Sequence, residues 1–260
     1  MKLQKPLLIF SLFLTFKSFA SKPLQAEALK KPVIISLGIN CEPALMARSF
    51  NIREWAFPFD WIGSFSFELI CQAIAEKFVH FLDERYLTYE EICIANSKYA
   101  LKFYHDFPVV DSTHVSEEYE NHGRIDPNFL AHLDKVKSKY KVRIDRFLSV
   151  LTGDRPVIFI RTHINPDQAK KFTTLIDTTY PSLSYRLVVV NEKNEHEYIW
   201  NLPKVVTFWP SERAYNYWFA ENEWEKIFSY LGLRFEHINA KKYVQNYCQD
   251  NFYAIHKNCA

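Results

Sequence analysis

The sequence predicts an α/β protein with a mostly parallel, doubly wound sheet and helices on both faces of that sheet. Short runs of β-branched and other apolar residues, typical of strands buried on both faces, alternate along the chain with longer segments of helical periodicity. The chain of 260 residues is 48% hydrophobic and holds only 5 glycines, a composition typical of a stiff globular core rather than a disordered protein. Strands and helices that alternate in this way form parallel sheets covered by helices.

The N-terminal residues 1–26 have the pattern of a signal peptide and leader. Two lysines precede an apolar run over residues 7–16, and the Ser-Phe-Ala sequence at 18–20 fits a cleavage site. The apolar run is too short to span a bilayer comfortably, and no later segment is apolar enough to do so. We therefore expect export to the periplasm or the extracellular space, no stable membrane span, and a single α/β domain over residues 32–260.

The first strand and helix, within residues 32–48, contain the candidate nucleophile Cys41. An apolar run at 33–35 predicts a buried strand, Gly38 permits a tight turn, and Asn40 is a good helix N-cap. Cys41 would then lie at the start of a helix, where free N–H groups and the helix dipole stabilise a thiolate. A cysteine that only fills space in the core would show the same local pattern, so the site needs a base.

The next segment, residues 53–64, is rich in aromatic residues and interrupted by proline and glycine, which predicts a loop. Its rings are expected to pack over the end of the sheet near Cys41, with Asp60 among them. Asp60 either belongs to the site or caps the following helix. The spacing of apolar residues predicts that helix over 65–81 and a second short helix over 86–95.

An alternating strand over residues 99–104 delivers His105 and Asp106 at its end. Ligand sites of open α/β sheets lie beyond the carboxyl ends of the strands, where Cys41 and His105 would both be. His105 is the predicted base for Cys41, with Asp106 or Asp60 orienting its imidazole ring. The alternative is a histidine that only hydrogen-bonds a backbone carbonyl.

Strands and helices continue to alternate in the second half of the chain. The predicted elements are a loop over 109–128, helices over 127–151, 166–178 and 218–231, and strands over 155–163, 185–191 and 205–208. Arg161 and His163, near the end of their strand, are expected on the same rim as Cys41. Arg161 and Arg53 would there attract a substrate carboxylate or phosphate.

Charge and motifs exclude several classes of function. The 32 basic and 30 acidic residues give a net charge of +2, which leaves no strong field for binding nucleic acid. The sequence has no phosphate-binding glycine motif and no Cys-x-x-Cys or His-Glu-x-x-His metal motif, so we expect no cofactor and no metal. The 5 cysteines are an odd number, which in an oxidising compartment leaves one thiol unpaired, and Cys41 is the candidate by position.

Several motifs occur together in a fixed order. They are Ser-Leu-Gly-x-Asn-Cys at 36–41, Phe-Pro-Phe-Asp-Trp at 57–61, His-Asp-Phe at 105–107, and Arg-x-x-Arg-Phe at 143–147, before a strand that carries Arg161. With these motifs the chain resembles a bacterial domain-of-unknown-function family, number 1796, described as papain-like cysteine peptidases. The resemblance implies that Cys41 is the nucleophile and that a histidine, here His105, serves it. The alternation of strands and helices looks more like the flavodoxin-like or SGNH hydrolases, whose nucleophile likewise follows the first strand.

Together these features predict an exported cysteine hydrolase that acts by acyl transfer on a peptide or another acyl substrate, including a glycan-linked one, with helix-start N–H groups around Cys41 holding the oxyanion. The predicted catalytic residues are Cys41, His105, Asp60 and Asp106, and the predicted substrate-binding residues are Asn40, Arg53, Trp61, Arg161 and His163. The alternative is a non-catalytic or glycan-modifying exported α/β protein, whose aromatic loop stacks on sugar and whose Cys41 only packs.

Overall fold

The computed structural model describes residues 30–111, 123–192, 200–215 and 218–234. The chain divides into two compact units, Met1–Lys30 and Lys31–Ala260. The predicted signal peptide and leader lie outside the described residues, so the fold below is that of the second unit. Within the described residues, no helix is long and apolar enough to cross a membrane.

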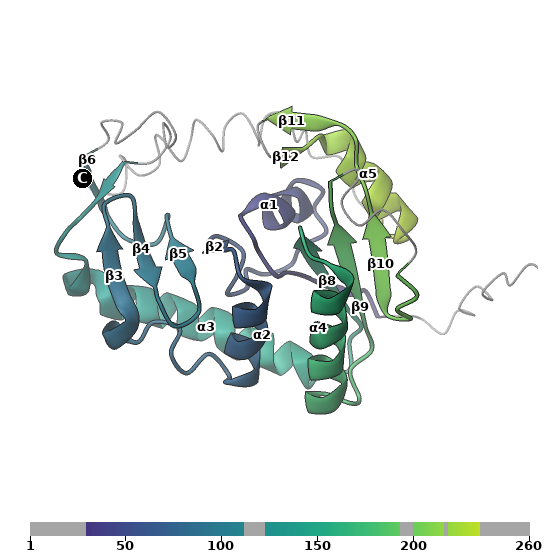
Figure 1. Cartoon of the computed structure of the whole chain (residues 1–260), viewed down its shortest axis with the longest axis horizontal. Coiled ribbons are helices and arrows are strands. Elements are labelled where there is room, and N and C mark those ends of the chain that lie inside the picture. Colours follow the sequence, from purple (N-terminus) through teal and green to yellow (C-terminus); the bar gives the residue numbers. More distant parts are fainter. Residues whose placement is uncertain (1–29, 112–122, 193–199, 216–217, 235–260) are drawn as a thin grey trace, which may run out of the picture. The chain divides into compact units, whose positions relative to one another are not determined.

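A parallel sheet of four strands organises this unit (Figure 1). Its strands are β1 (Val33–Ser36), β8 (Val157–Thr162), β9 (Tyr185–Val190) and β10 (Val205–Phe208), in the order β1-β8-β9-β10. All three neighbouring pairs are parallel. The prediction of these four strands from their apolar runs is confirmed. The doubly wound arrangement is not confirmed, because the order of the strands never reverses and the described sheet therefore has no topological switch point.

Helices cover both faces of this sheet, because the side chains of each strand alternate between them. On one face, Ile158 and Ile160 of β8 pack in a cluster with residues of α1 (Glu42–Ser49) and α5 (Glu221–Tyr230). On the other face, Val157 and Phe159 pack in the main core. The helices that contribute to that core are α2 (Phe67–Ala75), α3 (Leu133–Leu151) and α4 (Pro166–Thr179).

A second sheet is antiparallel, which corrects the prediction of a mostly parallel fold. Its strands are β2 (Gly63–Ser64), β5 (Leu101–Phe103), β4 (Cys93–Asn96) and β3 (Leu87–Glu90), in the order β2-β5-β4-β3. The helix predicted over 86–95 was wrong, because β3 and β4 form a hairpin there and Glu91 between them has a φ of 55°. Short apolar runs do not distinguish a strand from a helix, and the partner strand decided the outcome.

Several other bounds differ from the predictions. The helix predicted over 65–81 ends at Ala75, because Lys77 and Phe78 adopt φ angles of 50° and 62°, which are incompatible with a right-handed helix. The helix predicted over 127–151 begins at Leu133. The remaining short elements are η1 (Glu84–Tyr86), η3 (Phe129–His132) and the antiparallel pairs β6 (Val109–Asp111) with β7 (Arg124–Ile125) and β11 (Arg213–Tyr215) with β12 (Trp218–Phe219).

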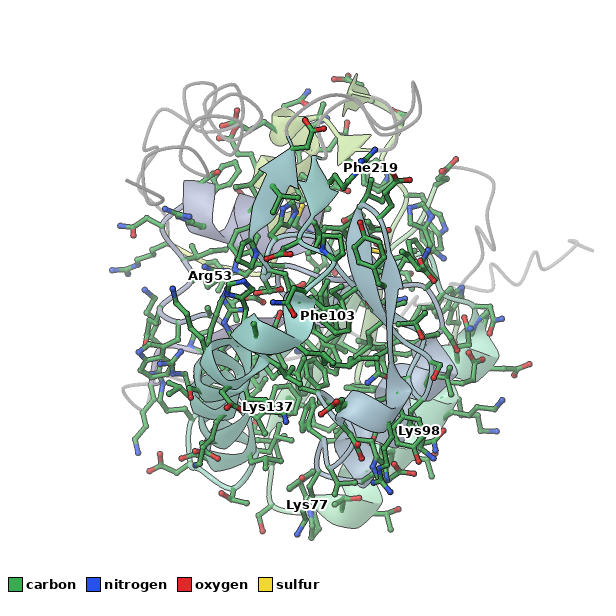
Figure 2. All side chains as sticks on the ribbon, turned by 90° about the vertical axis from the view of Figure 1, so that its left-hand side faces the viewer. Arg53, Lys77, Lys98, Phe103, Lys137 and Phe219 are labelled. Carbon is green, nitrogen blue, oxygen red and sulfur yellow. The ribbon has the colours of Figure 1, made fainter. Side chains whose placement is uncertain are left out.

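The main core is built largely of aromatic rings. The ring of Phe59, from the aromatic loop, lies 5.5 Å from that of Phe78 and 6.2 Å from that of Phe147 in α3, centroid to centroid. Figure 2 shows Phe103 of β5 deep inside this unit and Lys77 at its periphery. Such ring pairs each contribute about 0.5–1.5 kcal/mol beyond area burial, so they fix the aromatic loop against α3 and the segment that follows α2.

Candidate active site at the end of the parallel sheet

The turn that follows β1 is held in a single conformation. Gly38 and Ile39 have φ angles of 81° and 68°, and the N–H of Gly38 donates to Ser36 Oγ at 3.1 Å. Ser64 of β2 binds Ile39 twice, since Ser64 Oγ accepts from Ile39 N at 3.0 Å and Ser64 N donates to Ile39 O at 3.0 Å. A Cβ on Gly38 would lie 2.3 Å from Ser64 Oγ and 3.2 Å from Phe59 O. The position therefore requires glycine for its φ and for its space.

Arg161 of β8 is part of this turn rather than of an open rim. The residue is 1% exposed, and its Nη1 donates to Leu37 O at 2.8 Å and to Ser64 Oγ at 2.9 Å, while Nη2 donates to Ser64 O at 2.7 Å. Its guanidinium group also lies 5.1 Å from the centre of the Phe67 ring. Burial lowers its pKa to about 9. This geometry gives Arg161 a structural role and does not support the expected contact with a substrate.

Cys41 directly precedes α1 and is half-buried. Asn40 Oδ1 accepts from the N–H of Glu42 at 2.9 Å, and Cys41 O accepts from Leu45 N at 2.9 Å as the first helical bond. Asn40 thus caps a helix-start amide as predicted, although Cys41 occupies the N-cap position itself. The dipole of a helix favours negative charge at its start, which is the physical reason for expecting a thiolate on Cys41.

Glu42, the first residue of α1, is a buried acid whose partners the sequence did not reveal. It is 1% exposed, and its Oε1 accepts from Phe219 N at 2.8 Å and from Trp224 Nε1 at 2.9 Å. These two donors belong to β12 and α5. A carboxylate buried beside Cys41 therefore ties the start of α1 to the C-terminal part of the described chain.

His163 directly follows β8 and lies at the same edge of the sheet as Cys41. Strands β1 and β8 are parallel neighbours with Ser36 paired to Ile160, and α1 contacts both strands (Figure 1). The ring of His163 is stacked on that of Phe219, with centroids 6.2 Å apart and planes 16° apart. His163 thus follows the strand end from which it was expected to reach this rim, and its role in substrate binding stays a prediction.

His105 follows β5 in the antiparallel sheet, not a strand of the parallel sheet. The residue is exposed, and its ring centre lies 6.3 Å from that of Tyr104. Desolvation by the surrounding protein lowers the pKa of His105, which favours the neutral imidazole that a base requires. The pairing of His105 with Cys41 stays a prediction.

The two carboxylates expected to orient His105 are both engaged elsewhere. Asp106 Oδ1 accepts from Lys139 Nζ at 2.6 Å and Oδ2 accepts from the hydroxyl of Tyr140 at 2.8 Å. Asp60 is fully buried, and its Oδ2 accepts from Arg53 Nη1 at 2.7 Å and from the N–H of Phe57 at 2.8 Å. Asp60 Oδ1 has no hydrogen-bond partner, and burial raises the pKa of Asp60 to about 6.

Guanidinium groups lie over the two tryptophan rings of the aromatic loop. The guanidinium of Arg53 lies 5.1 Å from the ring centre of Trp61, and those of Arg146 and Arg155 lie 5.9 Å and 5.5 Å from that of Trp55. Arg146 Nη1 also donates to the carbonyl of Ala56 at 2.9 Å. The Arg-x-x-Arg-Phe motif of α3 therefore meets the aromatic loop, so two motifs about 90 residues apart in sequence adjoin in space.

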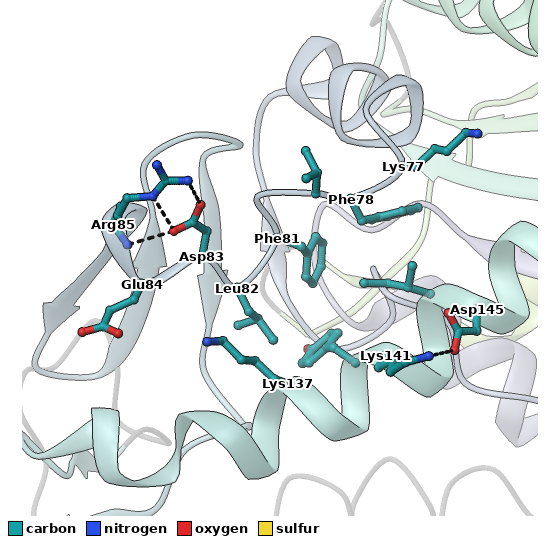
Figure 3. Close-up of a pocket in the computed structure, with 13 residues that line it drawn as sticks. Lys77, Phe78, Phe81, Leu82, Asp83, Glu84, Arg85, Lys137, Lys141 and Asp145 are labelled. Carbon is teal, nitrogen blue, oxygen red and sulfur yellow. Dashed lines mark hydrogen bonds and ion pairs between the residues drawn. The ribbon is translucent and has the colours of Figure 1, made fainter.

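An open groove lies elsewhere, between the segment that follows α2 and the middle of α3 (Figure 3). Phe78, Phe81 and Tyr140 contribute to its lining, and neither a cysteine nor a histidine does. Two ion pairs border it, Arg85 with Asp83 and Lys141 with Asp145 (Figure 3). Among the residues that the structure describes, no group of three or more His, Cys, Asp or Glu side chains is placed to hold a metal ion.

Comparison with known proteins places the site in a family context. A family model described as "Putative papain-like cysteine peptidase (DUF1796)" matches residues 32–195. The chain belongs to this family. The part matched to DUF1796 holds Cys41, Asp60, His105 and His163, and it ends before β10 and α5.

A protein similar in sequence to this DUF1796 chain is the "Uncharacterized protein R408" of Acanthamoeba polyphaga mimivirus. The two are 23% identical over 231 residues, which cover 75% of this chain and 96% of the viral protein. The expectation of a bacterial family is therefore not supported, because this named relative is viral. No solved structure matches the chain.

Proposed function

We propose that this member of the DUF1796 family is a cysteine-dependent hydrolase that works by acyl transfer, with Cys41 as its nucleophile. The observation that carries the proposal is the position of Cys41, half-buried directly before α1 at the carboxyl edge of the parallel sheet. The turn before it is fixed by Ser64 and by Arg161, so the thiol is held in place before any substrate arrives. The description of the family as papain-like cysteine peptidases supports a peptide as the substrate.

The proposed chemistry has two steps. A histidine takes the proton of the Cys41 thiol, the thiolate attacks the substrate carbonyl carbon, and the leaving group departs with the proton from the imidazolium. Water, deprotonated by the same imidazole, then attacks the thioester, which releases the acid and returns the proton to Cys41. The two candidate bases are His105, expected from the motif, and His163, which lies on the rim beside α1.

The backbone donors for the oxyanion are restricted by the local sequence. The N–H of Glu42 donates to Asn40 Oδ1, and Pro43 has no N–H. Neither of these two residues therefore offers a helix-start amide to a developing oxyanion. Substrate recognition by Asn40 would then be indirect, since its side chain caps α1.

Export through the N-terminal segment, and action on a peptide or another acyl substrate including a glycan-linked one, remain part of the proposal. The alternative, a sugar-binding protein that uses the aromatic loop, is less well supported. Phe57 and Phe59 are fully buried, and guanidinium groups lie over the rings of Trp55 and Trp61, where a sugar would stack.

The test is the rate at which iodoacetamide alkylates Cys41 between pH 5 and 10, with each cysteine followed separately by peptide mass mapping. Cys71 and Cys93 are internal controls, because burial raises the pKa of each to about 12. We expect an apparent pKa for Cys41 well below about 8.5, the value of an ordinary thiol. Full hydrolysis of ester, amide and thioester substrates by purified Cys41→Ala would contradict the proposal.

A further inference from the structure

His163 follows β8 at the carboxyl edge of the parallel sheet, the edge at which Cys41 also lies. We infer that His163 is the general base that serves Cys41, and that Glu42 positions it through Phe219. The inference rests on the proposed function of Cys41 as a nucleophile. It also gives His163 a role in the chemistry, in place of the substrate contact expected from the sequence.

The first support is topological. Strands β1 and β8 are directly hydrogen-bonded, and Leu37 N donates to Ile160 O at 2.8 Å at their carboxyl ends. Cys41 follows four residues after Leu37 and His163 follows three residues after Ile160. Because neighbouring parallel strands lie about 4.8 Å apart, the segments that carry Cys41 and His163 start from adjacent positions at this edge. His105 instead follows a strand of the antiparallel sheet.

The second support is a chain of contacts from α1 to the imidazole ring. Glu42, adjacent to Cys41, accepts the backbone N–H of Phe219 at 2.8 Å. Phe219 is 1% exposed and its ring is stacked on that of His163. The same Glu42 oxygen accepts Trp224 Nε1 at 2.9 Å, which fixes the carboxylate from a second direction. The residue after the nucleophile therefore holds the surface on which His163 rests.

The third support is the fixed backbone around His163. Its φ of 54° is in the left-handed region, which is sparsely populated for residues other than glycine. The N–H of His163 donates to Val190 O at 3.2 Å. The side chain of Asn191 binds both backbone groups of Ile164, with Oδ1 accepting from N at 3.1 Å and Nδ2 donating to O at 2.7 Å. Strand β9 thus holds His163 in this conformation.

The charged groups around this edge are held by partners other than His163. Arg161, two residues before His163, is bonded to Leu37 and Ser64 on the opposite side of β8. Glu42 directs one oxygen to Phe219 and Trp224, and Glu223 of α5 is bonded to Lys226. In the proposed step, the proton of the Cys41 thiol moves to the imidazole of His163, which leaves a thiolate and an imidazolium. The imidazolium then protonates the leaving group.

The test compares His163→Ala, His105→Ala and the control His132→Ala, whose side chain binds Asp126 away from the edge. In His163→Ala we expect the apparent pKa of Cys41 to rise toward about 8.5 and its alkylation rate at pH 6 to fall at least about tenfold, because one pKa unit changes the thiolate population tenfold. His132→Ala should match the wild-type profile. Imidazole added to His163→Ala should restore part of the hydrolysis of p-nitrophenyl acetate above the rate measured with imidazole alone. A variant that had lost activity through a packing defect would not regain it in this way.

Glu42 is tested with a conservative pair. Glu42→Gln keeps an oxygen that accepts from Phe219 and Trp224, so its alkylation profile should stay close to that of the wild type. Glu42→Ala should shift the pKa of Cys41 in the same direction as His163→Ala. If Glu42→Ala fails to fold, judged by circular dichroism, Phe219→Leu provides the test, because it keeps an apolar side chain and removes the stacked ring.

The outcomes separate the inference from the function on which it rests. A low pKa for Cys41 that survives in His163→Ala, or is lost only in His105→Ala, would overturn the role of His163 and leave the cysteine hydrolase standing. An ordinary pKa near 8.5 for Cys41 in the wild-type protein would overturn both.

Discussion

Arg161 Nη1 lies 2.9 Å from Ser64 Oγ, and this hydrogen bond joins the parallel sheet to the antiparallel sheet. The two residues are 97 positions apart in the sequence and both are buried. Because Ser64 Oγ also accepts from Ile39 N in the turn before Cys41, the same serine fixes both Arg161 and that turn.

Arg161→Ala should therefore strongly destabilise the protein. The change leaves the carbonyls of Leu37 and Ser64 buried without their donor, and such losses cost about 1–3 kcal/mol each. The matched control is Arg186→Ala in the neighbouring strand β9, where the side chain is exposed and the free energy of unfolding should change by less than about 0.5 kcal/mol. Urea unfolding of both variants measures the difference, and equal stabilities would contradict it.

Gly38→Ala should be far more damaging than Gly232→Ala, although both glycines have positive φ angles of 81° and 68°. A Cβ at Gly38 meets Ser64 Oγ at 2.3 Å, whereas nothing lies within 4 Å of one at Gly232. Gly232→Ala should cost about 1 kcal/mol from backbone strain alone. We expect Gly38→Ala to cost clearly more in thermal unfolding and to change the alkylation rate of Cys41. Similar melting temperatures for the two variants would show that the turn relaxes freely.

Asp60 should make the protein less stable as the pH rises from about 4 to 7. The pKa of Asp60 is about 6 in the folded protein, against an ordinary value of 3.8. Between these values the folded state binds a proton that the unfolded state has released, so protonation stabilises the folded protein, and this stabilisation is lost as the pH rises through 6. Asp60→Asn removes this dependence, and its stability relative to the wild type should rise over that range by up to about 3 kcal/mol. Urea unfolding at several pH values measures it.

Asp83→Asn is the control of opposite sign. Hydrogen bonds from Arg85 lower the pKa of Asp83, so its stabilisation is lost as the pH falls rather than as it rises. The stability of Asp83→Asn relative to the wild type should therefore improve toward acid pH. The same trend with pH in both variants would be incompatible with these two environments.

Asp106→Ala should lower the free energy of unfolding by about 2 kcal/mol or more. The buried carboxylate binds Tyr140 and Lys139, and its removal leaves the buried hydroxyl of Tyr140 without this partner. Asp145→Ala in α3, the helix that carries Tyr140 and Lys139, removes an exposed ion pair with Lys141 and should cost less than about 0.5 kcal/mol. Measuring the alkylation profile of Cys41 in both variants adds a second result. A shift in Asp106→Ala alone would support the predicted orientation of His105.

The sequence predicted those elements whose residues carry a strong local pattern. The four strands of the parallel sheet and α4 lie within two or three residues of their expected bounds, because β-branched runs and the proline at the start of α4 are local signals. The β3–β4 hairpin was missed because its short segments fit either period, and their pairing with β5 depends on residues outside the window.

The candidate site was predicted in part for the same reason. The turn and the helix start around Cys41 are encoded within ten residues, and the cap from Asn40 followed from its position. The burial of Arg161, the binding of Asp106 to α3 and the contacts of Glu42 with α5 depend on partners between 34 and 182 residues away. No local pattern contains that information.

The Glu42 contact with Trp224 also sets an order of events during synthesis. The helix that Cys41 precedes receives its last buried partners from β12 and α5, which are among the last described elements to leave the ribosome. Until then the Glu42 carboxylate lacks these two protein donors, and α1 lacks part of the surface it packs on. The surroundings of Cys41 in the folded structure are therefore complete only after α5 has been synthesised.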